Sequence, residues 1–558
     1  MVKKAHKFIM QKIQKKVFKQ AIILLIVLLQ LCGKKICVEA QSNKSVAKSI
    51  NNAPDGFPHG IVSSWAGAIT KKRQWEKYPY INAVMLDENM EWWKPKGNTY
   101  TFNWSTIDSD INYLLSLNRK FAFHVNYDYP HGFGYSPDTR QGADWIYDQI
   151  AAAGAPYQGI GGARPRGQYP AWYWHRGSNW PWKQMYGWLI KEEAYHLRTT
   201  FPGQCIYVRG QFNAVDPENM SSAGAKDVAM ATNSISDYAA WCAKTFWLAF
   251  MTEDTEFWKD RDVSKLTKAN RIQVMFKPKE GVEKMMEQYK FGVFLTHGSP
   301  DPDQYELFEE FCRNKKLPGA DETAGYPEMS NPQMFYDQQW YHLMALHSGF
   351  TTVAMRPGQI TIPDNPGVSD EIKTHFKESI SFVNKYLGYI HYPKQSPGAW
   401  IAFREPDRKN SYTGSNAGNW NFHITQVGTS CEINKQSPGQ NNIGDLFYGL
   451  YTRQVVEPIL LNVNDLLFGG EGNPVKILIT AFAKDTPAVL KLMWHAGNKS
   501  ETKVLNFNET NAWTTETINV TNISFNQAED LKIESISGKA YIHMVEILKQ
   551  ETKIARQN

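Results

Sequence analysis

The chain has 558 residues, of which 42% are hydrophobic and 13% aromatic, so it is long enough for two or three globular domains and its composition excludes a disordered protein. The formal net charge of +6 arises at the N-terminus, because residues 1–40 hold nine lysines and one glutamate and leave 52 basic and 54 acidic residues in the remainder. Such a balanced remainder gives no reason to expect a nucleic-acid partner.

The N-terminus has the pattern of an export signal. Basic residues from Lys3 to Lys19 precede an apolar stretch, Ala21–Leu31, which is short for a membrane span. Val38-Glu39-Ala40 is typical of a cleavage site. We therefore predict a signal peptide over 1–40, a mature chain without a stable membrane span, and secretion to an extracellular or periplasmic location; an uncleaved anchor is the alternative. Residues 41–58 are polar and predict a mobile lead-in.

Four cysteines follow the predicted cleavage site: Cys205, Cys242, Cys312 and Cys431. Their spacing is wide and irregular, with no CxxC motif and no histidine pair at metal-ligand spacing. We expect buried free thiols with at most one disulfide, and neither a metal site nor another cofactor.

The first part of the globular region predicts alternating strands and helices. Gly60–Trp65 and Ile81–Leu86 are short apolar runs typical of buried strands. A helical pattern over Ile111–Leu117 and a further strand over Arg119–Asn126 complete a βαβ unit. Ser105 is the expected N-cap of the helix, with Asp108 in the capping-box position.

The loop of this unit carries a recognisable pattern of residues: Trp92, Pro95, Gly97, Phe102, Trp104, Ser105, Ile107 and Asp108. The pattern resembles the second-strand signature of clan A glycoside hydrolases, including family 42 β-galactosidases. It departs from them at Lys94, where the family has an acid. The resemblance covers about residues 60–390 and is strongest over 85–126. It implies a (β/α)8 barrel with an acid/base after the fourth strand, a nucleophile after the seventh, and hydrolysis with retention.

The remaining barrel strands can be placed in chain order. Ile206–Val208, Arg271–Phe276 and Phe291–Thr296 predict the fourth, fifth and sixth strands. Phe350–Pro357 predicts the eighth, which leaves the end of the seventh at Asp321-Glu322. We therefore predict a barrel over 59–394, with a long Trp-rich insertion at 127–190.

Two glutamates occupy the positions to which the resemblance assigns catalysis. Glu218 follows the fourth strand and is the expected proton donor; Glu322 follows the seventh and is the expected nucleophile. The clan has Asn and Glu adjacent after the fourth strand, whereas here Asn213 precedes Glu218 by five residues. Asp216 is therefore an alternative proton donor, and Glu328 an alternative nucleophile.

Substrate contacts are expected from aromatic, amide, histidine and arginine side chains near the strand ends. Tryptophans of the insertion and the helix after it could form a saccharide-binding wall, or only a hydrophobic cluster beneath a long loop. The predicted substrate-binding residues are Trp172, Trp174, Trp182, His124, Asn126, Arg209, Gln211, Asn213, His297 and Arg356.

The composition changes near residue 395. Short strand patterns separated by turn residues, with no intervening helix, predict a C-terminal antiparallel β-sandwich over 395–558. Residues 405–450 are rich in Gly, Ser and Asn and are expected to be loops. The domain resembles the accessory sandwiches of glycoside hydrolases, which bind sugar or only pack against the barrel.

Together these features predict a secreted retaining glycoside hydrolase that cleaves a polysaccharide or oligosaccharide; a galactan or another anionic glycan is compatible with the Arg and His residues. The alternatives are a catalytically silent carbohydrate-binding protein and a polysaccharide lyase, which would need a Tyr or His base beside a charge neutraliser. The sequence gives no signal for oligomeric state.

Overall fold

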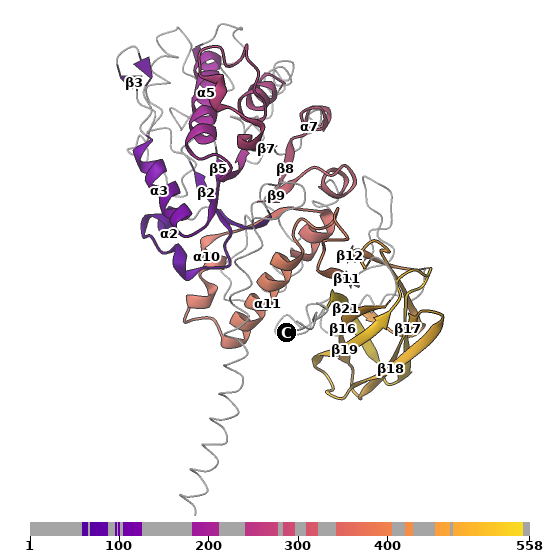
Figure 1. Ribbon diagram of the computed structural model, residues 1–558. Helices are drawn as coiled ribbons and strands as arrows, with labels where there is room; N and C mark the ends of the chain where they lie inside the picture. The colour runs from indigo at the N-terminus through magenta and orange to yellow at the C-terminus, as the bar shows by residue number, and fades with distance from the viewer. Residues whose placement is uncertain are drawn as a thin grey trace, which may run out of the picture. The chain divides into compact units, whose positions relative to one another are not determined.

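A computed structural model describes thirteen stretches of the chain: 59–64, 67–87, 95–96, 99–100, 104–124, 181–210, 240–276, 283–295, 308–321, 342–403, 419–427, 452–468 and 472–550. Figure 1 shows the fold.

Eight parallel strands form the first sheet, in the order β10-β1-β2-β5-β6-β7-β8-β9. In chain order they are β1 Gly60–Ser63, β2 Ala83–Asp87, β5 Lys120–His124, β6 Cys205–Arg209, β7 Gln273–Phe276, β8 Gly292–Leu295, β9 Gly319–Asp321 and β10 Thr352–Met355. The last strand pairs with the first in parallel, and the Thr351 N–H donates to the Gly319 carbonyl (2.9 Å) where β9 meets β10. The sheet thus curls into the predicted (β/α)8 barrel.

Helices lie between the strands along the chain. They are α2 Gly67–Lys71, α3 Ser105–Ser116, α5 Pro181–Thr200, residues 240–251, α7 Glu283–Tyr289, residues 342–348, α10 Pro357–Ile360 and α11 Asp370–Tyr386. Single turns of 3-10 helix lie at Trp75–Lys77, Val263–Lys265, Lys268–Asn270 and Ile362–Asp364. A π-helix spans Glu309–Asn314. The strands β3 Pro95–Lys96 and β4 Thr99–Tyr100 form a small antiparallel pair.

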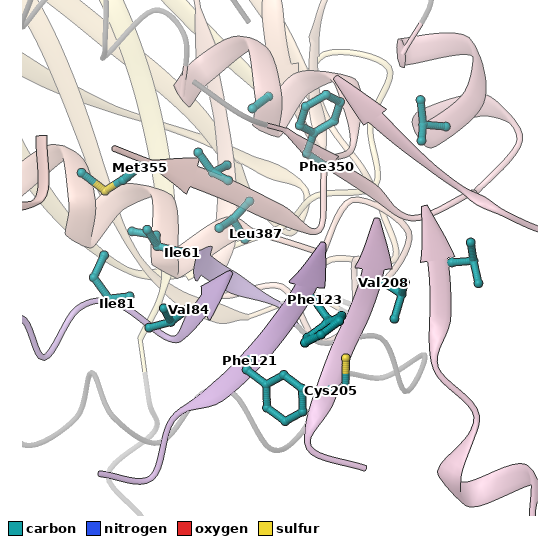
Figure 2. Close-up of a cluster of buried hydrophobic side chains, with 14 of the residues drawn as sticks. Ile61, Ile81, Val84, Phe121, Phe123, Cys205, Val208, Phe350, Met355 and Leu387 are labelled. Atoms are coloured by element: carbon teal, nitrogen blue, oxygen red, sulfur yellow. The ribbon is translucent and has the colours of Figure 1, made fainter. Parts of the chain in front are cut away.

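Each barrel strand presents one set of side chains to the helices and another to the barrel interior. The outward set includes Phe121 and Phe123 of β5, which belong to the same buried cluster as residues of α3 and α5 (Figure 2). The apolar members of the interior set lie on the strands: Val62, Ala83, Met85, Ala122, Ile206, Tyr207, Met275, Phe294 and Ala320. They form an apolar core inside the barrel, as expected for a barrel of this size.

The seventh strand, Gly319–Asp321, is short and lacks the β-branched or aromatic residues that usually mark a strand. Its first residue has no room for a side chain, because a Cβ on Gly319 would lie 2.7 Å from Cys312 Sγ and 2.8 Å from the Phe350 ring. Bulky neighbours fill the space that a larger strand residue would need. The strand spans Gly319–Asp321, and the sequence predicted its end at Asp321-Glu322.

The C-terminal region forms two antiparallel sheets, as predicted. One has the order β12-β11-β21-β16-β19, with β14 also paired to β21; the other has the order β13-β15-β20-β17-β18. Their strands are β11 Gly398–Ala402, β12 Trp420–Phe422, β13 Ile424–Gln426, β14 Arg453–Gln454, β15 Ile459–Val463, β16 Asn473–Ala483, β17 Ala488–Ala496, β18 Lys499–Phe507, β19 Trp513–Ile523, β20 Leu531–Ser537 and β21 Ala540–Lys549.

The expectation that 405–450 is all loop is wrong in part, because β12 and β13 lie within it. Their buried residues include Trp420, Phe422 and Ile424, which pack into the cores of the molecule despite the polar sequence around them. Packing with distant strands, which composition does not reveal, decides their conformation.

Strand β11 connects the two domains through its alternating side chains. Ile401 and Phe403, which directly follows the strand, belong to the core between the two sandwich sheets, whereas Trp400 and Ala402 belong to the barrel-side core. Both faces of the six-stranded sheet are thus buried at this strand. The sandwich is packed directly against the barrel.

Three of the four cysteines after the predicted cleavage site, Cys205, Cys242 and Cys312, are buried free thiols. Cys431 lies outside the described residues. Among the residues that the structure describes, no helix combines the length and the apolar character needed to cross a membrane.

Candidate active site at the carboxyl end of the barrel

The carboxyl ends of parallel barrel strands are where a (β/α)8 protein places its chemistry. Of the predicted site residues, the structure describes His124 at the end of β5, Arg209 at the end of β6 and Arg356 directly after β10. Trp182 lies in the first turn of α5. The other predictions fall outside the described residues: Glu218, Glu322, Trp172, Trp174, Asn126, Gln211, Asn213 and His297, with the alternatives Asp216 and Glu328.

The ends of three neighbouring strands bring polar residues into one row. Asp87, the last residue of β2, is the register partner of His124 on β5, and His124 is the register partner of Arg209 on β6. The backbone positions of these three residues are therefore neighbours across the sheet, and the side chains described among them are the imidazole of His124 and the guanidinium of Arg209. Sequence reasoning missed Asp87, although its place at the end of a predicted strand was a usable signal.

A β-bulge in β6 determines where Arg209 points. Cys205 pairs with Phe121 and Val208 with Phe123, so two residues of β6, Ile206 and Tyr207, stand opposite a single residue of β5. Ile206 and Tyr207 both belong to the interior set, whereas Cys205 and Val208 face the helices. Bulges of this kind re-aim the side chains that follow them. With regular alternation from Cys205, Arg209 would point to the helices; the bulge turns it into the barrel.

The interior position of Arg209 is confirmed by its contact with Phe294 of β8. The guanidinium carbon lies 4.5 Å from the centroid of the Phe294 ring, which is fully buried in the barrel interior. The ring of Tyr207, two residues before Arg209 on the same strand, has its centroid 6.1 Å from that of Phe294. Arg209 therefore extends from the fourth barrel strand to the sixth and makes a cation–π contact with Phe294.

His124 and Arg356 differ in their access to solvent. His124 is 1% exposed, so it could meet a substrate only from within the barrel. Arg356 is partly exposed, and its backbone N–H donates to Gln359 Oε1 (2.9 Å) at the start of α10. Proline at the first position of α10 fixes the turn that follows Arg356. Arg356 is thus held by its backbone at the barrel rim.

Two glycines shape the barrel around this row. A Cβ on Gly210, directly after Arg209, would lie 2.4 Å from the Phe276 ring, and one on Gly292 would lie 2.9 Å from Met275 Cγ. The Gly210 N–H donates to the Met275 carbonyl (2.9 Å), which holds the end of β6 against β7. The close approach of Gly210 to Phe276 fixes the backbone from which Arg209 extends.

The residues of the family-like pattern that the structure describes serve packing. Asp108 of α3 contacts His196 of α5, with 2.8 Å between Asp108 Oδ1 and His196 Nε2, and the Trp104 ring stacks on His196 at 3.8 Å between centroids. Burial lowers the pKa of His196 although the hydrogen bond to Asp108 opposes this. The predicted Ser105 cap is wrong: Ser105 is already the first residue of α3, and Trp104, with a helical φ of −71° and ψ of −11°, is the N-cap residue without a side-chain cap. These residues join two barrel helices and are not part of a site.

No protein-family model matches the chain, and no curated protein is similar to it in sequence. Solved structures with a related fold include the catalytic domain of a β-amylase from Paenibacillus polymyxa (11% identity, TM-score 0.40), covering 59% of this chain and 99% of that one. An endo-1,4-β-xylanase from Penicillium canescens covers 56% of this chain and 84% of that one (12% identity, TM-score 0.31). A carbohydrate-binding module of a Cellvibrio mixtus lichenase covers 23% and 90% (16% identity, TM-score 0.14). The chain is thus distantly similar in structure to glycoside hydrolases and to a carbohydrate-binding module.

Proposed function

We propose that the chain is a secreted retaining glycoside hydrolase that cleaves a polysaccharide or oligosaccharide with two carboxyl groups at the carboxyl end of its barrel. Glu322 is the proposed nucleophile and Glu218 the proposed acid/base. The sequence resemblance to clan A enzymes supplies the assignment, and family 42 remains the proposed relationship within that clan.

The observation that carries the proposal is the position of the seventh barrel strand. β9 is seventh in the barrel order and ends at Asp321, and Glu322 is the next residue in the chain. Likewise β6 is the fourth strand and ends at Arg209, nine residues before Glu218. These are the two strands after which the resemblance places the nucleophile and the proton donor. The strand order therefore supports the assignment that the sequence suggested.

The proposed reaction has two balanced steps. A carboxylate oxygen of Glu322 attacks the anomeric carbon while the glycosidic C–O bond breaks, and the proton of Glu218 passes to the leaving oxygen. In the second step Glu218 takes a proton from water, the water oxygen attacks the anomeric carbon, and the bond to Glu322 breaks. Such pairs work at a carboxyl separation of about 5–5.5 Å.

The residues around the barrel end have supporting roles in this proposal. His124 and Arg209 are proposed to meet a sugar hydroxyl, and Trp172, Trp174 and Trp182 are proposed to stack on sugar rings. Asn126, Gln211, Asn213, His297 and Arg356 are proposed to hydrogen-bond or orient the glycan. The two arginines and the two histidines make a galactan or another anionic glycan the first substrate class to test.

The test is turnover of a panel of neutral and anionic polysaccharides by the wild type, Glu218→Ala and Glu322→Ala. We expect both variants to lose activity by several orders of magnitude, and azide to restore turnover of Glu322→Ala as a glycosyl azide of inverted anomeric configuration. Glu256→Ala is the matched control, because that carboxylate is 83% exposed outside the barrel end.

Three outcomes would contradict the proposal. Full activity in both variants would remove the site assignment. Loss of activity in Asp216→Ala instead of Glu218→Ala, or in Glu328→Ala instead of Glu322→Ala, would move the role to the neighbouring carboxylate. Binding of one glycan without turnover of any would make the chain a catalytically silent carbohydrate-binding protein.

A further inference from the structure

Arg356 is a cation at the carboxyl end of the barrel that the protein does not pair with an anion of its own. It directly follows β10, the eighth barrel strand, and its side chain is partly exposed. Within the described part of the chain, no hydrogen bond, ion pair or ring contact joins its guanidinium to another residue. Its Nε–H is buried and has no acceptor there. A buried donor without an acceptor costs stability, so this group is suited to a ligand that supplies one.

The side chain of Arg356 points toward the interior of the barrel. Val353 and Met355, which precede it on β10, belong to the outward cluster that packs against the helices. The backbone stays extended through Arg356, with φ of −84° and ψ of 161°. Because successive side chains of an extended chain alternate between the two faces of a sheet, Arg356 lies on the face opposite to Met355. The guanidinium is therefore directed to the mouth of the barrel, where a substrate enters.

Hydrogen bonds of the backbone alone hold Arg356 in place. Its N–H donates to Gln359 Oε1 (2.9 Å), and its carbonyl accepts from the N–H groups of Gln359 and Ile360 (3.0 and 2.9 Å). Pro357 begins the helical turn that follows. The side chain takes part in none of these bonds. The fold thus fixes the point from which the guanidinium extends and leaves its charge unused.

Arginines elsewhere in the barrel are engaged within the protein. Arg119 is almost fully buried and donates to the Tyr78 carbonyl (3.0 Å). Arg198 is fully buried and pairs with Glu253, with 2.7 Å between Arg198 Nη2 and Glu253 Oε1. In both cases the guanidinium joins segments of the protein to each other. Arg356 has no such structural task.

The neighbouring strand adds no competing charge beside Arg356. Ser63 of β1 is the register partner of Met355, and the Ser64 N–H donates to the Met355 carbonyl (2.9 Å). Ser64 therefore stands next to Arg356 across the sheet, and its side chain is small and uncharged. Neither β1 nor β10 contains a carboxylate. An anion that meets the guanidinium at this pair of strands does not have to displace one supplied by them.

A guanidinium recognises oxyanions by its shape as well as its charge. Its planar fork of N–H groups donates two parallel hydrogen bonds to a carboxylate or a tetrahedral oxyanion, and it stays charged at every pH where enzymes work. We propose that Arg356 forms an anion subsite that takes the carboxylate of a uronic acid or the sulfate ester of a sugar unit bound beside the eighth strand. This inference rests on the proposed function and specifies its substrate class, an anionic glycan and not a neutral one.

The experiment compares glycans that differ only in charge. The pairs are a sulfated galactan with its desulfated form and a polyuronate with its carboxyl-reduced form. Dissociation constants from isothermal titration calorimetry, together with kcat and KM, are measured for the wild type, Arg356→Met, Arg356→Gln and Arg356→Lys. We expect the wild type to bind the charged member of one pair about tenfold or more tightly than its neutral member. The preferred pair distinguishes a sulfate from a carboxylate.

Replacing the guanidinium should remove this preference without affecting the chemical step. We expect Arg356→Met and Arg356→Gln to bind both members of the pair equally, with a raised KM for the charged glycan and little change in kcat. Arg356→Lys should keep part of the preference, because it retains the charge but not the fork. Lys259→Met is the matched control, since it removes one positive charge from a side chain that is 70% exposed and precedes the amino end of β7. Its preference should equal that of the wild type.

The outcomes separate this inference from the proposed function. Equal binding of charged and neutral glycans by the wild type, or an unchanged preference in a folded neutral variant, would overturn the inference even if a glycan is hydrolysed. Selective binding of a charged glycan that Arg356→Met or Arg356→Gln loses, without turnover of any glycan by the wild type, would uphold the anion subsite and refute the proposed hydrolase.

Discussion

The barrel meets its surroundings in two very different ways, at its junction with the sandwich and at its carboxyl end. At the junction, polar groups are paired with one another: the Tyr386 hydroxyl donates to Glu546 (2.7 Å), which also pairs with Lys385 (3.0 Å), and Arg313 donates to Asn421 Oδ1 (2.6 Å). At the carboxyl end, Arg209 lies on an aromatic ring above apolar residues. The junction is thus held by paired polar groups, whereas the described contact of Arg209 at the carboxyl end is with an aromatic ring.

The junction also buries aromatic residues of the sandwich that could otherwise bind sugar. Trp400 and Phe422 stack at 6.1 Å between centroids, and Trp400 also contacts Phe382 of α11 at 5.6 Å. Trp400 and Phe422 lie on the barrel side of the six-stranded sheet and are fully or almost fully buried. They cannot stack on a sugar while the domains are packed together. The sandwich therefore stabilises the barrel through this sheet.

The largest expected effect is a loss of stability at the junction between the barrel and the sandwich. Trp400→Ala removes a fully buried indole shared by both domains and should destabilise the protein by about 3–5 kcal/mol. Differential scanning calorimetry should show a single transition at a lower Tm, because the barrel and the sandwich share this core. Trp400→Phe, which keeps an aromatic ring, should lose less stability. A separate sandwich transition with an unchanged barrel transition would show that the junction does not couple them.

A second prediction concerns the acid sensitivity of the junction. His423 Nε2 lies 2.9 Å from the Tyr389 carbonyl, and burial lowers the pKa of this histidine to about 4, with smaller effects from Arg313, Lys549 and His391. The unfolded chain, with an ordinary histidine pKa near 6.5, binds a proton that the folded chain does not. Stability is therefore lost as the pH falls from about 6.5 to 4, on the order of 2–3 kcal/mol.

The variant that checks this is His423→Asn, since asparagine tolerates the φ of 60° at this position and does not titrate. We expect the decrease in Tm between pH 6.5 and 4 to be smaller in the variant than in the wild type. His342, whose pKa burial lowers to about 3, contributes a decrease of the same sign that remains in both proteins. Equal decreases in the two proteins would mean that His423 is not a source of the acid sensitivity.

The smallest expected change in stability, at the carboxyl end, should have a disproportionate effect on activity. Gly210→Ala forces a Cβ against Phe276, a ring also packed against Phe246 and Phe291, and should cost about 1–2 kcal/mol. Because the shift falls on the residue after Arg209, kcat should fall more than this loss of stability explains. Gly358→Ala is the control, since a Cβ there meets no atom within 4 Å. An unchanged kcat in Gly210→Ala would show that the backbone position at the end of β6 does not affect catalysis.

The barrel could be predicted from the sequence because strands buried on both sides form short apolar runs between helical patterns, as in β1, β2, β5 and β6. The seventh strand was located only by counting, since its small residues reflect the crowding around Gly319. β18 was not predicted because seven of its nine residues are exposed and polar or charged residues dominate it. Its conformation comes from pairing with β17 over nine residues, which is a long-range interaction.

For the candidate site, the sequence predicted which polar residues lie at the strand ends but not the direction in which their side chains point. His124, Arg209 and Arg356 were chosen because polar residues follow apolar runs, and all three do lie at the ends of barrel strands. The direction of Arg209 could not be predicted, because it depends on a bulge created by how β6 pairs with β5. The contact with Phe294, 85 residues later, is equally a product of the fold.

The most direct test of the central claim is the anomeric configuration of the first product formed by the wild type, followed by proton NMR on the best substrate of the panel. A double displacement by two carboxyl groups predicts a product with the anomeric configuration of the substrate, which then mutarotates to equilibrium. A first-formed product of inverted configuration would contradict the account, since it would require a single displacement by water and exclude Glu322 as a covalent nucleophile.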